Sequence, residues 1–115
     1  MDKEEELPKL QPNYKLWLEH NGEYVFGPGA YAILKSIDET GTITEGAKKL
    51  GMSYRYAWGV IRKIEEKLDV KLLHSYKGGT VGGGGADVTE FGKSLMHLFS
   101  KVDREFSSAV EEHKS

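Results

Sequence analysis

The chain has no cysteine and only three prolines among its 115 residues. The missing thiols exclude a disulfide scaffold, a thiolate zinc site and a cysteine nucleophile, and they are typical of a reducing compartment. No apolar run approaches the roughly 20 residues that a membrane span requires. The first six residues, MDKEEE, are acidic and lack the apolar stretch of a secretory signal. We therefore expect a cytoplasmic protein with no membrane partner.

Catalytic and metal-binding patterns are also missing from the sequence. The four histidines, His20, His74, His97 and His113, show no metal-ligand spacing, and no Ser-His-acid arrangement is evident. We expect neither an enzyme nor a bound metal or cofactor. The composition, 38% hydrophobic and 30% charged, is that of a globular protein, and the length suits one small domain.

The charge is distributed unevenly along the chain. The formal net charge is −2, which by itself argues against a nucleic-acid binder. Residues 41–80, however, hold eight basic side chains against four acidic ones, whereas segments 1–13, 14–40 and 81–115 each carry two more acidic than basic residues. Because fields act over a Debye length of about 8–10 Å, the charge of a local patch matters more than the total. By its charge, only the middle of the chain, residues 41–80, is suited to binding a polyanion.

Two short apolar runs near the amino terminus predict a β-hairpin. Residues 14–20 and 23–26 flank Asn21-Gly22, the strongest local signal for a tight hairpin turn. Residues 1–13 are polar, contain two prolines and show no periodicity. We expect them to form a flexible arm.

Capping residues and apolar periodicity predict two helices after the hairpin. Pro28 suits the start of the first helix, and Gly41 suits its end. Thr42 or Thr44 then caps a short helix over residues 45–50. This helix precedes Gly51, a natural stop.

The next segment predicts a longer helix followed by a small sheet. Ser53 caps a helix that runs to residue 68, with apolar positions at helical spacing. The glycine-rich stretch 78–85 can only be a loop, and it lies between strand candidates at 72–74 and 86–88. Two helices around a tight turn, followed by strand, loop and strand, predict a winged helix-turn-helix over residues 14–92.

The last helix is expected from the capping residue Thr89 to about residue 112. Its apolar side chains follow a nearly heptad seam that is longer than one small core needs. The predicted fold is therefore mainly α with small β (α+β), and residues 93–115 are expected to form a dimerisation helix in a homodimer. The seam residues are Leu95, Phe99, Val102, Phe106 and Val110.

The helix at 53–68 presents hydroxyl, aromatic and cationic side chains on the face opposite its apolar stripe. Such groups are suited to phosphates and base edges in the major groove of double-stranded DNA. The expected contacts come from this helix, from the start of the preceding helix and from the wing at 75–88. They are Thr42, Thr44, Ser53, Tyr54, Arg55, Tyr56, Arg62, Lys63, Lys77 and Thr80.

Several of these side chains also have a structural interpretation. Tyr56 and Trp58 are compatible with either the core or the DNA face. Arg62 and Lys63 could instead pair with helix acids such as Glu65. A winged helix used for protein association, with a merely solvated basic face, is the alternative function.

Two runs resemble the amino-terminal domain of the ModE-type molybdate-responsive regulators. These are GTITEGAKKLGMSYRYAW at 41–58 and GGGGADVTEFG at 82–92, in the family's order and separation. The GMSY-x-x-AW pattern at 51–58 is more specific than a generic helix-turn-helix. More distantly, the unit is similar to the LysR-type winged helix.

The resemblance implies a homodimeric transcriptional regulator that pairs through its terminal helix and places helix 53–68 in the major groove. On matching positions it points to Ser53, Tyr54, Arg55, Tyr56 and Arg62 as DNA-facing. Members that sense molybdate carry separate carboxy-terminal oxyanion-binding domains, and nothing in this sequence matches one. We therefore expect no small-molecule ligand and no molybdate-binding domain.

Overall fold

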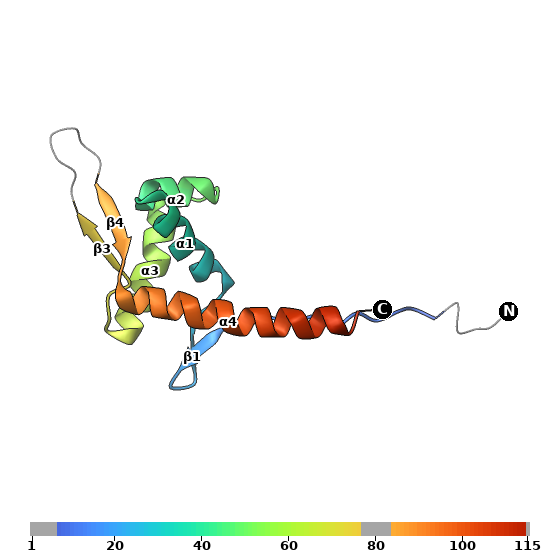
Figure 1. Ribbon diagram of the computed structural model, residues 1–115. Coiled ribbons are helices and arrows are strands. Elements are labelled where there is room, and N and C mark those ends of the chain that lie inside the picture. The colour runs from blue at the N-terminus through green and yellow to red at the C-terminus, as the bar shows by residue number, and fades with distance from the viewer. Residues whose placement is uncertain (1–6, 77–83, 115) are drawn as a thin grey trace.

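The computed structural model describes residues 7–76 and 84–114, which form four helices and two antiparallel hairpins (Figure 1). The fold is mainly α with small β, as predicted. No helix within these ranges is long and apolar enough to cross a membrane. The elements are β1 (Leu18–His20), β2 (Glu23–Phe26), α1 (Pro28–Thr40), α2 (Ile43–Lys49), α3 (Tyr54–Leu68), β3 (Leu73–Tyr76), β4 (Gly85–Val88) and α4 (Glu90–Glu112).

The amino-terminal hairpin turns at Asn21-Gly22, as the sequence predicts. Both residues have positive φ, 52° and 80°, which is the geometry of the two-residue turn that matches strand twist. The paired strands are shorter than the apolar runs, because residues 14–17 lie outside β1. Residues 7–13 form neither helix nor strand and are exposed.

Side-chain caps begin three of the helices. Ser53 Oγ accepts a hydrogen bond from Tyr56 N at 3.0 Å, and Thr89 Oγ1 accepts one from Gly92 N at 3.0 Å, both as predicted. For α2 the cap is Thr42, whose Oγ1 accepts from Glu45 N at 2.9 Å. This helix therefore starts at Ile43, two residues before the predicted start, and Thr44 lies inside its first turn.

The wing is attached to the rest of the domain by backbone hydrogen bonds. β3 and β4 pair antiparallel, and Ala86 N also donates to Gly41 O at the end of α1 (2.9 Å). At the base of the wing, Thr89 N donates to Leu72 O at 3.0 Å. β3 starts one residue later than predicted and extends to Tyr76. The wing's base therefore has a fixed position against the helices.

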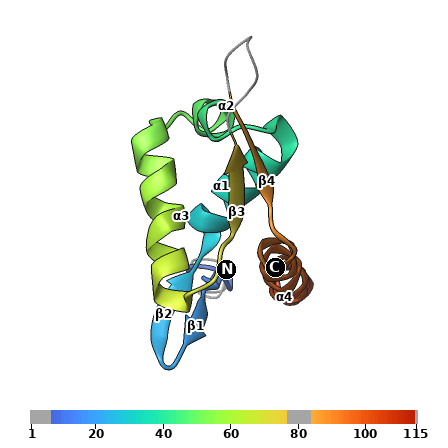
Figure 2. The ribbon, with the colours of Figure 1, turned by 90° about the vertical axis from the view of Figure 1, so that its left-hand side faces the viewer.

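The core lies between α1, α3 and the two hairpins, and α4 closes it from one side (Figure 2). Phe99 of α4 is buried, packs edge-on against Phe26 (centroids 5.6 Å apart) and stacks on Tyr31 (5.2 Å). These contacts orient α4 on the domain. The largest fully buried side chains of the described residues form the centre of the core, and they are Phe26, Ile33, Leu34, Ile37, Ile61 and Leu72.

The carboxy-terminal half of α4 extends beyond the body of the domain (Figure 1). The segment before β1 contacts this half, since Tyr14 stacks on Phe106 with ring centroids 5.4 Å apart. The Tyr14 hydroxyl also donates to Asp103 Oδ1 at 2.7 Å. That hydrogen bond raises the pKa of Tyr14 above its ordinary value, because ionisation would remove the donated proton.

Candidate nucleic-acid interface

The helix-turn-helix depends on a close contact between α1 and α2. A Cβ at Gly46 would lie 2.8 Å from Ile37 Cγ1 and 3.0 Å from Ile37 N, so only glycine fits without a shift. Ser36 Oγ donates to Gly46 O at 2.8 Å in the same contact. The next residue of α2, Ala47, is buried as well.

The turn between α2 and α3 sets the start of α3. Gly51 has φ of 71°, and Met52 N donates to Ala47 O at 3.0 Å. Ser53 then caps α3, so the exposed amino-terminal end of this helix directly follows a hydrogen-bonded turn. Such an end is where a recognition helix enters the major groove.

The two faces of α3 divide largely as predicted. Ala57, Ile61 and Ile64 are buried, while Val60 is half-buried. Six positions of the opposite face are exposed: Ser53, Tyr54, Arg55, Tyr56, Gly59 and Lys63. The two open interpretations are resolved in different ways. Tyr56 is 60% exposed, whereas Trp58 is half-buried and packs against the core.

Within the described part of the middle segment, residues 41–76, four basic side chains are engaged by other groups of the chain. Lys49 Nζ lies 2.7 Å from Glu39 Oε1, and this ammonium holds the pKa of Glu39 below its usual range. Lys67 Nζ donates to the backbone oxygen of Tyr24 at 3.1 Å. The other two, Arg62 and Lys71, both approach Glu65.

Arg62 is held by its own helix. Its guanidinium lies 3.5 Å from Glu65 Oε1 and 3.7 Å from Glu66 Oε2, and it covers the Trp58 ring with 5.8 Å to the centroid. The alternative of intrahelical pairing is thus realised for Arg62. Its side chain stays 42% exposed, so one edge remains open to an outside partner.

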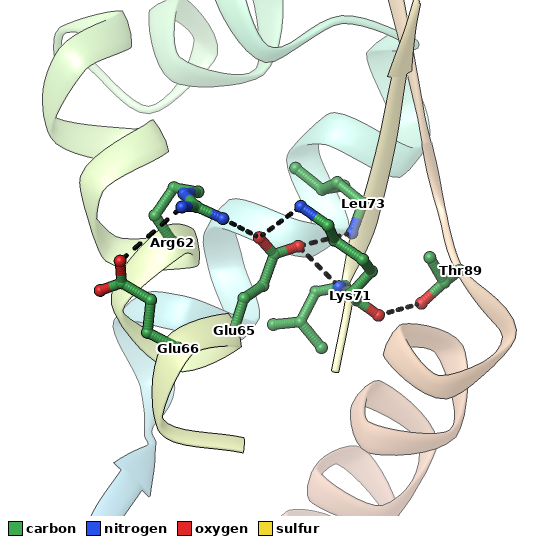
Figure 3. A network of polar contacts seen from close by, with 7 residues as sticks. Arg62, Glu65, Glu66, Lys71, Leu73 and Thr89 are labelled. Atoms are coloured by element: carbon green, nitrogen blue, oxygen red, sulfur yellow. Dashed lines mark hydrogen bonds and ion pairs between the residues drawn. The ribbon is translucent and has the colours of Figure 1, made fainter. Parts of the chain in front are cut away.

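Glu65 has a structural role that the sequence interpretation did not find, since it named this residue only as an ion-pair partner for Arg62 or Lys63. Its side chain is only 3% exposed, and Oε2 accepts from the backbone N–H of Leu72 (2.7 Å) and of Leu73 (3.2 Å). Oε1 accepts no hydrogen bond from the described residues and lies between Arg62 and Lys71, as Figure 3 shows. The helical spacing could have found it, since Glu65 is four residues after buried Ile61.

Three cations on the helix-turn-helix form no ion pair or hydrogen bond with the residues that the structure describes. They are Lys48 on α2 and Arg55 and Lys63 on α3, and all three are exposed. These side chains are available to an anionic partner. Of the eight basic residues in segment 41–80, four are thus engaged within the chain and three are not. The eighth, Lys77, lies outside the described residues.

The remaining predicted contacts lie at the start of α2 and on the wing. Thr42 is half-buried at the cap and Thr44 is exposed in the first turn. Lys77 and Thr80 fall in residues 77–83, outside the described part of the chain.

The predicted seam on α4 is only partly open. Phe99 is buried in the chain's own core, and Leu95 packs partly against it. Phe106 is 47% exposed beside Tyr14, while Val102 and Val110 are half-buried. Leu98, 49% exposed, adds an apolar side chain that the seam did not include.

No group of three or more histidine, aspartate or glutamate side chains in ranges 7–76 and 84–114 is arranged to hold a metal ion.

Comparison with curated proteins gives several ModE relatives. The chain is 40% identical over 72 residues to the transcriptional regulator ModE of Yersinia pestis, covering 63% of this chain and 27% of the relative. It is 33% identical over 90 residues to the DNA-binding transcriptional dual regulator ModE of Escherichia coli strain K12, covering 78% and 34%. The molybdenum-pterin-binding protein MopA of Rhodobacter capsulatus is 30% identical over 95 residues, covering 83% and 36%. The chain thus spans about a third of the length of these relatives.

Solved structures support the winged-helix fold. ArgP from Mycobacterium tuberculosis superposes with a TM-score of 0.57 at 19% identity, covering 74% of this chain and 30% of that one. A mutant of MepR from a multidrug resistant S. aureus clinical isolate gives 0.53 at 21% identity, covering 76% and 62%. Residues 29–93, from α1 to the start of α4, match the model of the bacterial regulatory helix-turn-helix proteins of the lysR family. The chain belongs to this family, with a ModE-like amino-terminal winged helix.

Proposed function

We propose that the chain binds double-stranded DNA sequence-specifically as a homodimer and acts as a transcriptional regulator. The main support for this proposal is a set of three exposed cations that form no ion pair or hydrogen bond with the described residues. They are Lys48, Arg55 and Lys63. They lie on the helix-turn-helix of a chain whose relatives are named as transcriptional regulators.

In the proposed complex α3 enters the major groove with its amino-terminal end. Arg55 and the exposed tyrosines Tyr54 and Tyr56 face the base edges there, and Lys63 lies two turns further along. The hydroxyls of Ser53 and Thr42 accept the capping hydrogen bonds, which leaves their own protons for phosphate oxygens. Thr44 contributes a further exposed hydroxyl beside the α2 cap.

The wing and Arg62 complete the proposed surface. The backbone bonds at the base of β3–β4 fix the direction in which the wing leaves the domain, and we place it along the flanking DNA backbone. Arg62, ion-paired to Glu65, would direct its open edge at a phosphate. Lys77 and Thr80 are the proposed wing contacts.

Fluorescence anisotropy with a labelled duplex of random sequence tests DNA binding. We expect the logarithm of affinity to fall with the logarithm of salt concentration by about 0.9 for each phosphate contact. Replacing the unengaged cations together by alanine (K48A/R55A/K63A) should reduce the magnitude of this slope by the amount expected for about three phosphate contacts. The matched control, K35A/K101A/R104A, removes equal charge outside the helix-turn-helix and should leave the slope in place.

Absence of detectable affinity at ~50 mM salt, where phosphate contacts are strong, would show that the DNA proposal is wrong. It would favour the alternative of a winged helix used for protein association.

A further inference from the structure

A cavity of about 300 Å³ lies between the amino-terminal hairpin, the start of α1 and one face of α3. Its volume is at the lower end of the range for small-molecule sites. Neither the fold nor the proposed DNA contacts need an open cavity here. Its floor is apolar, with Val25, Ala30, Ile33 and Ile64 all buried.

The polar groups of the cavity gather at its rim. Among the described residues, its only charged lining side chains are Lys63 and Lys67, one helical turn apart on α3. Tyr24 and Tyr56, 49% and 60% exposed, add aromatic faces and hydroxyls. No carboxylate from ranges 7–76 and 84–114 lines the cavity, so the charge that these ranges place at its mouth is entirely positive.

This combination specifies one class of ligand. An apolar floor accepts a ring, the tyrosine rings stack with it, and two ammonium groups at the rim attract an anion. We propose that the cavity binds a small aromatic carboxylate, with the ring between β2 and α3 and the carboxylate at Lys63 and Lys67.

The location gives such a ligand a regulatory consequence, which rests on the proposed DNA-binding function. Tyr56 and Lys63 belong both to the cavity and to the proposed DNA face of α3. A carboxylate bound at Lys63 neutralises one of the three unengaged cations. Ligand and duplex therefore oppose each other, each weakening the other by the same factor.

Direct binding can be measured without DNA by following backbone amide signals during titration with sodium benzoate. Benzamide tests the need for charge, and sodium acetate tests the need for the ring. We expect benzoate to shift signals of residues 24–33 and 56–67 and to bind about tenfold more tightly than either control, because each lacks one of the two interactions. Lys67→Met should weaken benzoate binding several-fold, whereas Lys35→Met, an exposed lysine of α1 outside the cavity, should not.

Equal shifts with all three probes, or equal effects of the two lysine variants, overturn the proposal. The effect on DNA is measured separately, as duplex affinity with and without saturating benzoate. Selective benzoate binding to a chain that binds no duplex supports the cavity and refutes the DNA function. Duplex binding without selective benzoate shifts refutes the cavity alone.

Discussion

The carboxylate of Glu65 on α3 accepts a hydrogen bond from the backbone N–H of Leu72 at 2.7 Å, one residue before the wing begins. The same oxygen accepts from Leu73 N at 3.2 Å. A buried carboxylate thereby links the proposed recognition helix to the wing. Because the two elements are proposed to contact adjacent parts of one duplex, their relative position matters for both stability and binding.

Removing this link should destabilise the domain. We expect Glu65→Ala to cost about 2–4 kcal/mol of unfolding free energy, because two backbone N–H groups lose their acceptor in a buried site. Glu65→Gln, which keeps an acceptor oxygen, should cost less. Urea denaturation gives the free energies, and hydrogen exchange at Leu72 and Leu73 should accelerate in parallel.

Glu66→Ala is the control, since its 69% exposed side chain predicts a change within about 0.5 kcal/mol. Equal losses at positions 65 and 66 would contradict the proposed link.

The contact between α1 and α2 predicts that Gly46→Ala is destabilising. The added methyl group meets Ile37 Cγ1 at 2.8 Å and the backbone N of Ile37 at 3.0 Å, and the backbone cannot rotate away. We expect a loss of about 1–3 kcal/mol, as for other overpacked sites. Thermal denaturation measures it, and an unchanged midpoint would show that the helices separate without cost.

Gly59→Ala should act in opposite directions on stability and on DNA binding. Apart from its chain neighbours and the backbone of its own helix, no atom of the described residues lies within 4 Å of a Cβ built at Gly59, and alanine stabilises a helix interior by about 0.5–1 kcal/mol. Packing within the described part of the chain therefore does not explain this glycine, and we attribute it to a close approach of DNA to the α3 backbone. The variant should unfold at higher urea concentration and bind the duplex more weakly. Unchanged duplex affinity would remove that explanation.

The elements themselves could be predicted from sequence because their signals are local. The Asn21-Gly22 turn and the caps Ser53 and Thr89 each act within three residues, and the apolar stripe of α3 needs only helical spacing. The first residue of α2 could not be predicted in the same way. Two threonines compete there for one cap, and sequence spacing gives no preference between Thr42 and Thr44.

The contacts that position the elements could not be predicted, because they join residues far apart in the chain. The Tyr14–Asp103 hydrogen bond spans 89 positions, and the Gly46 contact depends on how closely α1 approaches. Helical spacing places Glu65 on the inward face of α3. Its buried carboxylate is stabilised, however, by the backbone N–H of Leu72, and the position of Leu72 does not follow from spacing. Which lysines remain unengaged likewise depends on distant carboxylates and carbonyls such as Glu39 and Tyr24 O.

Arg55 is the proposed base-reading residue, and its removal tests specificity. We expect Arg55→Ala to cost about 1–3 kcal/mol of binding free energy and to relax preference at one base position. Selection from a randomised duplex library followed by sequencing reports both effects. Arg104→Ala on α4 removes the same charge outside the helix-turn-helix and serves as control. A uniform loss over all sequences would make Arg55 a phosphate contact instead.

The contact of Tyr14 with α4 predicts an alkaline release of the amino-terminal segment. The folded pKa of Tyr14 is raised by its hydrogen bond to Asp103. Its contribution to stability is therefore complete below the unfolded pKa of about 10 and is lost as pH rises through the folded value. Ultraviolet titration of the phenol and exchange protection near residue 14 measure this. Tyr14→Phe keeps the stacking on Phe106 and should abolish the pH dependence. If this variant shows the same alkaline transition as the wild type, the transition arises from another group.

The protruding half of α4 predicts a homodimer that a single charge can separate. Phe106 is 47% exposed and Val110 half-buried on a stretch that extends past the domain body, and a partner helix would cover both. Sedimentation velocity at tens of micromolar should give a dimer. Val110→Asp should shift it toward monomer, because a carboxylate would be buried without a partner. Ser108→Asp places the same charge on an exposed position of α4 turned about 200° from residue 110, and it should leave the dimer intact.

In the dimer, two-fold symmetry sets half-sites about one helical turn of DNA, 34–36 Å, or a simple multiple apart. A wild-type monomer at these concentrations would remove the dimer proposal and, with it, the requirement for a symmetric binding site.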